Sequence, residues 1–411
     1  MAELHEDLGN GMVMRGLRDE ADARAFVALS DAVTREGPIC DRLVRHRPGG
    51  GRQDFFVVED TRTGRVASTT CLLPWHLDFC GIPLGAAMLE MVVTHPDYRK
   101  LGLVRSQIGR FHRIADERAM DLCIIQGIPW YYRQFGYAYA LDHRPRIQLP
   151  VGVIPDAWQP GTVEPCGDRD VADLQTLYDS GEPGPRIRVV RTAEDWIYLR
   201  ERAGVAFRIL RAREGRAADG YAACRIADGV LSVDEQAMRG AAAAQAFLAW
   251  AKRQAAGTVE LYGPPQGALW QAARSLGGTV PPCGQWLLRI PDPVRLLSRI
   301  APVIDARLAA AGFAHLEGAL TINLFRTAIR LRFASGRLDT VEDAKFLDAS
   351  MGAADPGDLL IPPDAFVRLV MGFRGIGELR DAWPELWVRP AVRGLVDALF
   401  PRLPSWIHMP Y

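Results

Sequence analysis

One segment of this 411-residue sequence combines a glycine with three basic residues in an arrangement that suits phosphate binding. It runs from Met91 to Arg105 and contains Arg99, Lys100 and Gly102 between a strand-like stretch and a helix-like stretch. The pattern predicts a loop that exposes backbone N–H groups at the start of a helix, where the helix dipole adds partial positive charge. A pyrophosphate could approach the backbone closely at glycine, which has no Cβ. An ordinary strand-to-helix turn with solvated basic residues would show the same pattern.

The elements that must position this segment alternate between strand and helix patterns. Strands are predicted at 54–59, 66–73, 86–94 and 122–125, with a helix at 104–119. A second stretch has predicted strands at 205–212, 220–226 and 259–262 and a helix at 241–256. The last stretch has predicted helices at 294–311, 363–372 and 392–400 and strands at 318–326 and 328–333. The predicted fold class is therefore α/β (α+β).

Composition favours a globular chain of two or three domains, with 48% hydrophobic and 24% charged residues. Acidic and basic residues balance to a formal net charge of zero, which gives no support to a nucleic-acid partner. The seven cysteines are scattered without a C-x-x-C pair, so we expect no metal site. No apolar run reaches the ~20 residues of a membrane span, and no signal peptide is visible. We therefore expect a cytoplasmic protein with no membrane partner.

The segment from 91 to 105 resembles motif A of the GCN5-related N-acetyltransferase (GNAT) superfamily. In that motif, Arg/Gln-x-x-Gly-x-Gly/Ala cradles the pyrophosphate of coenzyme A. The present sequence has Arg99-x-x-Gly102-x-Val104, preceded by the usual strand and His-Pro turn. Val104 departs from the motif, but the backbone N–H groups do the binding.

A second segment, Gln126 to Tyr137, follows the strand predicted at 122–125. Its run Tyr-x-x-Phe-Gly-Tyr is similar to the tyrosine-bearing helix after the fifth strand of many GNAT enzymes, where the coenzyme lies between the parting fourth and fifth strands. By this resemblance Tyr132 is the general acid for the departing thiolate. The transfer is feasible because a phenol's ordinary pKa, about 10, lies within ~1.5 units of a thiol's. The neighbouring tyrosines are expected to pack, and Trp130 either walls an acceptor pocket or packs in a core.

The resemblance also implies a reaction and a set of binding residues. An acetyl group would move from acetyl-CoA to a primary amine of a small molecule or peptide, with no metal. Backbone N–H groups near Val93 would polarise the thioester carbonyl, and such pre-aimed donors contribute strongly to catalysis. The expected cofactor-binding residues are Val92, Val93, Thr94, Arg99, Lys100, Leu101, Gly102, Leu103, Val104 and Arg105.

The whole chain resembles a narrower group, the enhanced intracellular survival (Eis) type of acetyltransferase. That resemblance implies a catalytic GNAT domain at 1–150, a degenerate GNAT-like domain at 151–291 and a sterol-carrier-protein-like α+β domain at 292–411. In the middle stretch, Ser232 to Gly240 occupies the place of the phosphate loop, lacks the Arg-x-x-Gly pattern and carries two acids. The middle domain is therefore expected to bind no coenzyme. The resemblance further implies a symmetric homo-oligomer, of which a hexamer is one form.

In Eis-type enzymes the chain's own C-terminal carboxylate is the general base, which here would be that of Tyr411. A free α-carboxyl has an ordinary pKa of about 3.3–3.7 and is a weak base in water, although desolvation would raise that pKa. A frayed terminus is the alternative. The neighbour, Pro410, is not the acid that family members often carry, and this departure weakens the transfer of a polycationic, aminoglycoside-like substrate preference. If the tail is not the base, His95 and Glu90 are the next candidates.

Two other functions fit the sequence. One is a non-catalytic protein that binds a lipid or another apolar ligand on the same scaffold, against which the retention of Tyr132, Arg99 and Gly102 argues. The other is a narrow-specificity tailoring acyltransferase, because motif A binds the coenzyme and not the acyl chain.

Overall fold

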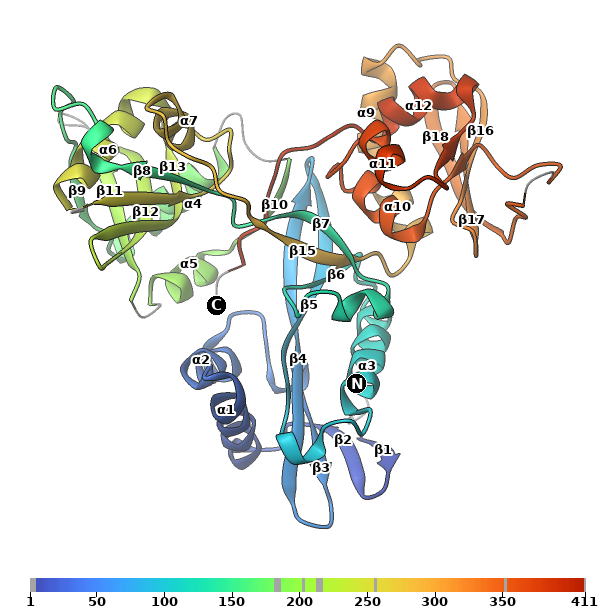
Figure 1. Cartoon of the computed structure of the whole chain (residues 1–411), viewed down its shortest axis with the longest axis horizontal. Coiled ribbons are helices and arrows are strands. Elements are labelled where there is room, and N and C mark those ends of the chain that lie inside the picture. Colours follow the sequence, from blue (N-terminus) through green and yellow to red (C-terminus); the bar gives the residue numbers. More distant parts are fainter. Residues whose placement is uncertain are drawn as a thin grey trace. The chain divides into compact units, whose positions relative to one another are not determined.

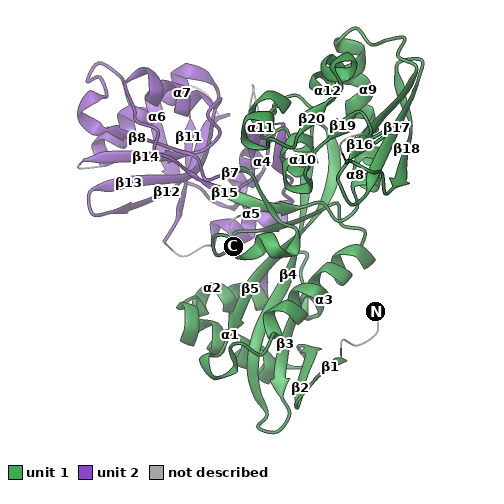
Figure 2. Cartoon of the chain, turned by 45° about the vertical axis from the view of Figure 1, so that its right-hand side comes forward, with its two compact units in different colours: residues 1–45, 49–141, 285–403 green, residues 46–48, 142–284, 404–411 purple. Residues whose placement is uncertain are grey.

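The computed structural model describes residues 5–180, 186–201, 204–211, 217–254, 257–350 and 353–409. They fall into two compact units, the first made of 1–45, 49–141 and 285–403 and the second of 46–48, 142–284 and 404–411 (Figure 2). Each unit combines sheets with helices, which confirms the predicted mixed α/β class.

The first unit contains a long sheet with strand order β1-β2-β3-β4-β5-β6-β15-β7 (Figure 1). The strands are β1 (His5–Gly9), β2 (Met12–Gly16), β3 (Phe55–Asp60), β4 (Arg65–Phe79), β5 (Ile82–Thr94), β6 (Leu122–Ile125), β15 (Gly284–Arg289) and β7 (Ala138–His143). Helices α1 (Glu20–Thr34) and α2 (Gly37–His46) lie on one side of this sheet, and α3 (Leu103–Glu117) lies on the other (Figure 1). The strands and helix predicted between 54 and 125 are confirmed.

Helix α3 forms because its apolar residues recur at helical spacing and all face the sheet. Leu103, Ile108, Phe111 and Ala115 are buried in one core together with residues of the sheet. Burying a side chain the size of leucine or phenylalanine stabilises a fold by about 1.5–3 kcal/mol. Gln107 is the one polar residue on this buried face, and it is completely buried.

Two strands pair in a different sheet from the one expected from their position in the sequence. In β15, Leu287 to Arg289 pair antiparallel with Ile125 to Cys123 of β6, although this range falls inside the predicted middle domain. Conversely, β8 (Arg146–Pro150) pairs with a strand of the second unit. The three domain ranges given by the sequence stay a prediction.

The second unit has a six-stranded sheet with order β8-β14-β13-β12-β11-β9. Its other strands are β9 (Thr162–Pro165), β11 (Ala206–Arg211), β12 (Ala218–Ala227), β13 (Val230–Met238) and β14 (Thr258–Tyr262), and its helices are α4 (Val171–Asp179), α5 (Ala193–Arg200), α6 (Gly240–Gln254) and α7 (Ala268–Ser275). The predicted strand pair is confirmed as the antiparallel β11–β12 pair. A parallel pair joins β10 (Ile187–Val189) to β21 (Ser405–Trp406), and residues 404–409 belong to this unit.

The stretch from 232 to 240 is not a loop. Its residues up to Met238 belong to β13, and α6 begins at Gly240, so Arg239 alone connects strand and helix. In the first unit, β5 ends at Thr94 and α3 begins at Leu103. The stretch that was expected in the place of the phosphate loop is therefore the end of a strand and the start of a helix, because its alternating residues are those of a strand.

The C-terminal part of the first unit has a five-stranded sheet with order β18-β17-β16-β19-β20. These strands are β16 (Gly318–Asn323), β17 (Ala328–Ala334), β18 (Arg337–Lys345), β19 (Leu359–Leu360) and β20 (Trp387–Val388), and the helices are α8 (Pro293–Arg299), α9 (Ala301–Ala310), α10 (Pro363–Val370), α11 (Ile376–Ala382) and α12 (Arg393–Leu399). The single helix predicted at 294–311 is wrong. It breaks at Ile300 because Pro302, which has no N–H to donate, fits only in the first turn of a new helix. The likeness to sterol-carrier proteins stays a prediction.

Candidate functional site

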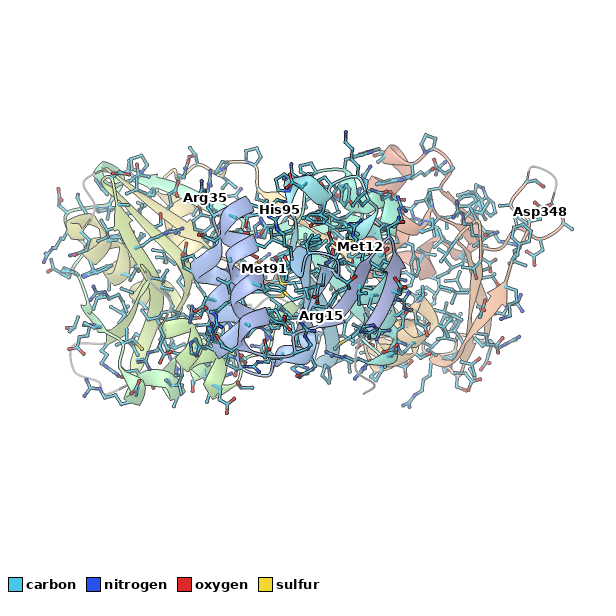
Figure 3. All side chains as sticks on the ribbon, turned by 90° about the horizontal axis from the view of Figure 1, so that it is seen from below. Met12, Arg15, Arg35, Met91, His95 and Asp348 are labelled. Atoms are coloured by element: carbon cyan, nitrogen blue, oxygen red, sulfur yellow. The ribbon has the colours of Figure 1, made fainter. Side chains whose placement is uncertain are left out.

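Strands β5 and β6 part in the middle of the first sheet. Their parallel pairing covers Ala86 to Met88 and ends there, whereas β5 continues to Thr94. Beyond Met88, β5 also carries a bulge against β4, with Met91 in the left-handed region at φ 52° (Met91 is labelled in Figure 3). Bulges of this kind redirect a strand next to a site. One edge of β5 is thus no longer paired with β6.

A cavity of about 560 Å³ lies beside this edge, a volume typical of small-molecule sites. It is lined by the end of α1, the end of β5, the loop before α3, the first turn of α3 and the turn that carries Tyr132. Nine of the ten expected cofactor-binding residues line it, namely Val92, Val93, Thr94, Arg99, Lys100, Gly102, Leu103, Val104 and Arg105. The tenth, Leu101, is 58% exposed and is not among the lining residues.

The loop before α3 has the backbone that an anion site needs. Lys100 and Gly102 have positive φ angles of 65° and 78°, and a Cβ on Gly102 would meet no atom within 4 Å. The first hydrogen bond into the helix runs from Ser106 N–H to Gly102 O, at 3.2 Å. The N–H groups of residues 103–105 therefore precede the first intrahelical bond and remain for a ligand.

Two hydrogen bonds hold this loop to the sheet. His95 N–H donates to Ala67 O at 2.9 Å, and the Tyr98 hydroxyl donates to Asp60 Oδ2 at 3.1 Å (His95 is labelled in Figure 3). The His95 ring is also used, because its Nδ1 accepts from the Asp97 N–H at 3.3 Å. The loop is thus fixed before any ligand binds.

The basic residues of the loop differ in their surroundings. Arg99 and Lys100 are exposed. Arg105 donates to Gln134 Oε1 at 2.8 Å and lies over the Phe135 ring at 5.3 Å, so it ties α3 to the turn that carries Tyr132.

A buried polar network lies behind the end of β5, and the sequence analysis missed it. The Ser68 hydroxyl contacts Val93 O and the Gln107 side-chain amide, each at 2.8 Å, and Thr94 Oγ1 at 2.9 Å. In the structure, Gln107 Oε1 faces the hydroxyl, and Gln107 Nε2 is buried without a hydrogen-bond partner among the described residues. Ser68 has one proton, so it can donate to Val93 O only if this amide is turned round, with its nitrogen toward Ser68. The network then fixes the carbonyl of Val93. The available signal was Gln107 itself, a polar residue on the apolar face of α3.

Tyr132 lies on a short 3₁₀ turn, Tyr131–Phe135, and not on the α-helix that the resemblance implied. It lines the cavity while being only 4% exposed. Burial raises the pKa of its hydroxyl, and the nearby Tyr131 and Glu90 raise it further. The phenol is therefore protonated at neutral pH. Its ring occupies the space where a Cβ on Gly127 would lie.

Behind Tyr132 is a second buried cluster. The ring of Tyr137 lies 6.2 Å from that of Tyr132, and its hydroxyl is 3.2 Å from His112 Nε2. Burial, with a contribution from Arg289, lowers the pKa of His112 to about 4. Arg289 belongs to β15 and also contacts Cys123 Sγ at 3.9 Å. A strand distant in sequence thus completes the surroundings of the tyrosine turn.

Trp130 is not a core residue, because it is 73% exposed, with the Arg133 guanidinium 4.6 Å from its ring centre. Tyr411 and Pro410 lie outside the described residues. Within the described ranges, no group of three or more His, Cys, Asp or Glu residues could hold a metal ion. None of the helices described is both long and apolar enough to cross a membrane.

Comparison with known proteins agrees with this geometry. Residues 15–140 match the family model described as an acetyltransferase (GNAT) domain. No curated protein sequence matches the chain.

Several solved structures have the same fold over nearly the whole chain. A conserved Enterococcus faecalis protein described as a probable N-acyltransferase has a TM-score of 0.75 and 14% identity, covering 97% of this chain and 100% of its own. A GCN5-related N-acetyltransferase from Anabaena variabilis has a TM-score of 0.70 and 16% identity, covering 96% and 99%. Eis1 from Mycobacterium abscessus has a TM-score of 0.67 and 15% identity, covering 97% and 100%. At these identities the likeness shows the fold alone, and residues 15–140 are the part of the chain that matches the GNAT domain family.

Proposed function

We propose that this protein is an N-acetyltransferase that moves an acetyl group from acetyl-CoA to a primary amine of a small molecule or peptide. One observation carries the proposal. A single cavity is lined by the glycine loop at the start of α3, by the edge of β5 that leaves β6, and by the buried Tyr132. The matched GNAT domain and the names of the structural neighbours support the same reaction class.

The residues present fit the coenzyme. The N–H groups of residues 103–105 and the open space at Gly102 would bind its pyrophosphate, with Arg99 and Lys100 supplying positive charge. The end of β5, Val92 to Thr94, would hold the pantetheine arm through its backbone. Bound acetyl-CoA supplies an acetyl group activated as a thioester.

The chain's own groups would manage charge and protons. Backbone N–H near Val93 would polarise the acetyl carbonyl, and the Ser68–Gln107 network keeps this part of β5 in place. The Tyr132 hydroxyl would donate its proton to the departing thiolate, for which burial keeps it protonated. The carboxylate of Tyr411 would take the proton from the attacking amine.

Acetyl transfer can be tested with purified protein, acetyl-CoA and a panel of small amines and peptides, by measuring thiol release. We expect acceptor-dependent thiol release and a coenzyme affinity that Gly102→Glu abolishes. Gly64→Glu is the matched control, because Gly64 also has a positive φ, 68°, and open space, but lies in the turn between β3 and β4. Absence of both coenzyme binding and thiol release would refute the proposal. A co-purifying lipid in such a protein would instead indicate an apolar-ligand carrier.

A further inference from the structure

The second unit encloses a buried ion pair. Arg191 donates through both terminal nitrogens to the two carboxylate oxygens of Glu235, each at 2.6 Å, and both side chains are almost completely buried. The Tyr221 hydroxyl donates to Glu235 Oε1 at 2.8 Å. The guanidinium also lies 4.6 Å from the ring centres of both Tyr178 and Trp196. The pair is therefore surrounded by a tyrosine hydroxyl and two aromatic rings of this unit, while Arg191 Nε is buried without a hydrogen-bond partner among the described residues.

The last described residues of the chain lie against this pair. Arg191 donates to the main-chain oxygen of His408 at 3.3 Å, and His408 Nε2 is 3.6 Å from Glu235 Oε2. The His408 ring packs on Trp406 at 5.4 Å, and Trp406 to Met409 are all buried. Pairing of β21 with β10 and a 2.7 Å hydrogen bond from Arg186 N–H to Pro404 O hold the start of the segment. The segment 404–409 is thus held along its whole length.

The ion pair lies where the pairing of two strands ends in the second sheet. Pairing of β13 with β14 ends at Val233 and Leu261, and Glu235 follows just beyond. In the first sheet, Glu90 lies equally far beyond Met88, where β5 leaves β6 to line the cavity. At the position where the first sheet opens toward its cavity, the second sheet therefore carries the buried pair that receives the chain's end.

The energetics of buried ion pairs also favour a positioning role for this pair. Desolvating two charges costs about as much as their attraction returns, so a buried ion pair is weak support for stability by itself. Such pairs are well suited to fixing one arrangement among several. Because Arg191 binds a main-chain oxygen, it fixes the path of the segment and not merely one side chain.

We propose that the second unit is a clamp for the C-terminal segment 404–409 and that Arg191 and Glu235 are its positioning residues. The clamp rests on the observed contacts, while its catalytic purpose rests on the proposed function, in which the Tyr411 carboxylate is the base. Met409 is the last residue described, so only Pro410 lies between the clamped segment and Tyr411. The degenerate GNAT-like unit then serves catalysis by holding the chain's end and not by binding a coenzyme.

Hydrogen exchange of the full chain tests the clamp directly. We expect the amides of 405–408 to be protected in the wild type and to exchange at least about tenfold faster in Arg191→Met, while helix α6 keeps its protection. Arg211→Met is the control, because Arg211 pairs with Asp170 in the same unit at 2.5 Å, away from the segment. Rapid exchange of 405–408 in the wild type, or an unchanged rate in Arg191→Met, would refute the clamp. If α6 loses protection in Arg191→Met, the double variant Arg191→Met/Glu235→Met, which leaves no unpaired charge, decides instead.

Steady-state kinetics test the positioning role. Release of the segment should lower kcat by about 10²-fold, as misplacement of a reacting group by ~1 Å does, and leave the coenzyme dissociation constant unchanged. Arg211→Met should keep its kcat. A released segment with normal kcat would overturn the positioning role. A wild type without any transferase activity would refute the proposed function, and with it that role, while the exchange rates would still decide the clamp.

Discussion

Tyr132 is buried but lines the cavity. We propose that its hydroxyl donates a proton to the departing thiolate in the transition state. Tyr132→Phe should therefore lower kcat by roughly 10²–10⁴, the range for loss of a general acid. The coenzyme dissociation constant should change little, because the lost contact belongs to the transition state and not to binding. Steady-state kinetics with calorimetry would measure both.

The matched control is Tyr131→Phe, because Tyr131 lines the same cavity next to Tyr132. It should keep near-normal turnover. Near-normal turnover in Tyr132→Phe would make Tyr132 a packing residue and require another acid.

His112 predicts a specific pH dependence of stability. Its pKa falls from the ordinary 6.5 to about 4 in the folded chain, mainly through burial. Between these values the unfolded chain binds a proton that the folded chain does not, so stability falls as pH falls from 6.5 to 4. His112 contributes at most about 3 kcal/mol to this loss, because solvent screens part of the effect at a partly exposed side chain.

Urea unfolding at several pH values measures this slope. It should become less steep in this range in His112→Gln, which keeps a polar partner for Tyr137. A slope should remain, because burial also lowers the pKa of His143 to about 4. The same substitution at His76, whose side chain is exposed, should leave the slope unchanged. An unaltered slope in His112→Gln would contradict the assignment.

At the scale of single residues, the sequence predicted the site residues that lie within one continuous segment. The loop at Gly102 and the tyrosine turn could be found because each is one continuous segment. Ser68 and Gln107 could not be paired in advance, because they meet only through the packing of α3 on the sheet. The surroundings of His112 likewise depend on Arg289, which a distant strand supplies.

Among the elements, the turn that carries Tyr132 depends on one glycine. A Cβ at Gly127 would occupy the position of the Tyr132 ring. Gly127→Ala should therefore displace Tyr132 and lower kcat by about 10²-fold, because a shift of ~1 Å at a reacting group has that effect. Kinetics with the purified variant would measure the loss.

Gly109→Ala is the control for this substitution. Gly109 lies within α3, where an added Cβ would meet no atom within 4 Å. Alanine there should preserve turnover and stabilise the helix by up to about 1 kcal/mol. Equal kcat in Gly127→Ala and the wild type would show that the ring tolerates the added methyl group.

Strands and helices with clear periodicity were predicted well, including β3, β5, α3 and the β11–β12 pair. The helix expected at 294–311 was wrong because periodicity alone does not register the break that Pro302 imposes. The partner of β15 was beyond sequence analysis for a different reason. A short apolar strand pairs with any edge of suitable register, and only the complete fold selects β6.

For the whole molecule, the difference between the strand-to-helix connections of the two sheets predicts that one coenzyme molecule binds per chain. The eight-residue loop and turn between β5 and α3 have no counterpart in the second unit, where Arg239 alone connects β13 to α6. Saturating acetyl-CoA at ~100-fold over its dissociation constant should stabilise the chain by about 2.7 kcal/mol. Calorimetry that finds two equivalent sites would contradict this account of the second unit.

The chain's end predicts a sensitivity to tags. Residues added after Tyr411 convert its carboxylate into an amide, and deletion of Tyr411 moves the carboxylate by up to ~3.5 Å. Both changes should lower kcat by about 10²-fold or more and leave coenzyme binding intact, because the Gly102 loop is a separate element. Full activity of a C-terminally tagged protein, measured against an N-terminally tagged control, would exclude the carboxylate as base and direct attention to Glu90 and His95.

The place of β15 between β6 and β7 also sets an order of events during synthesis. When the ribosome has made residues 1–150, the edges of β6 and β7 have no strand between them, and β8 has no sheet to join. Unpaired strand edges are prone to pair with other chains. The first sheet is complete only when residue 289 has left the ribosome, so it stays incomplete while the entire second sheet is translated.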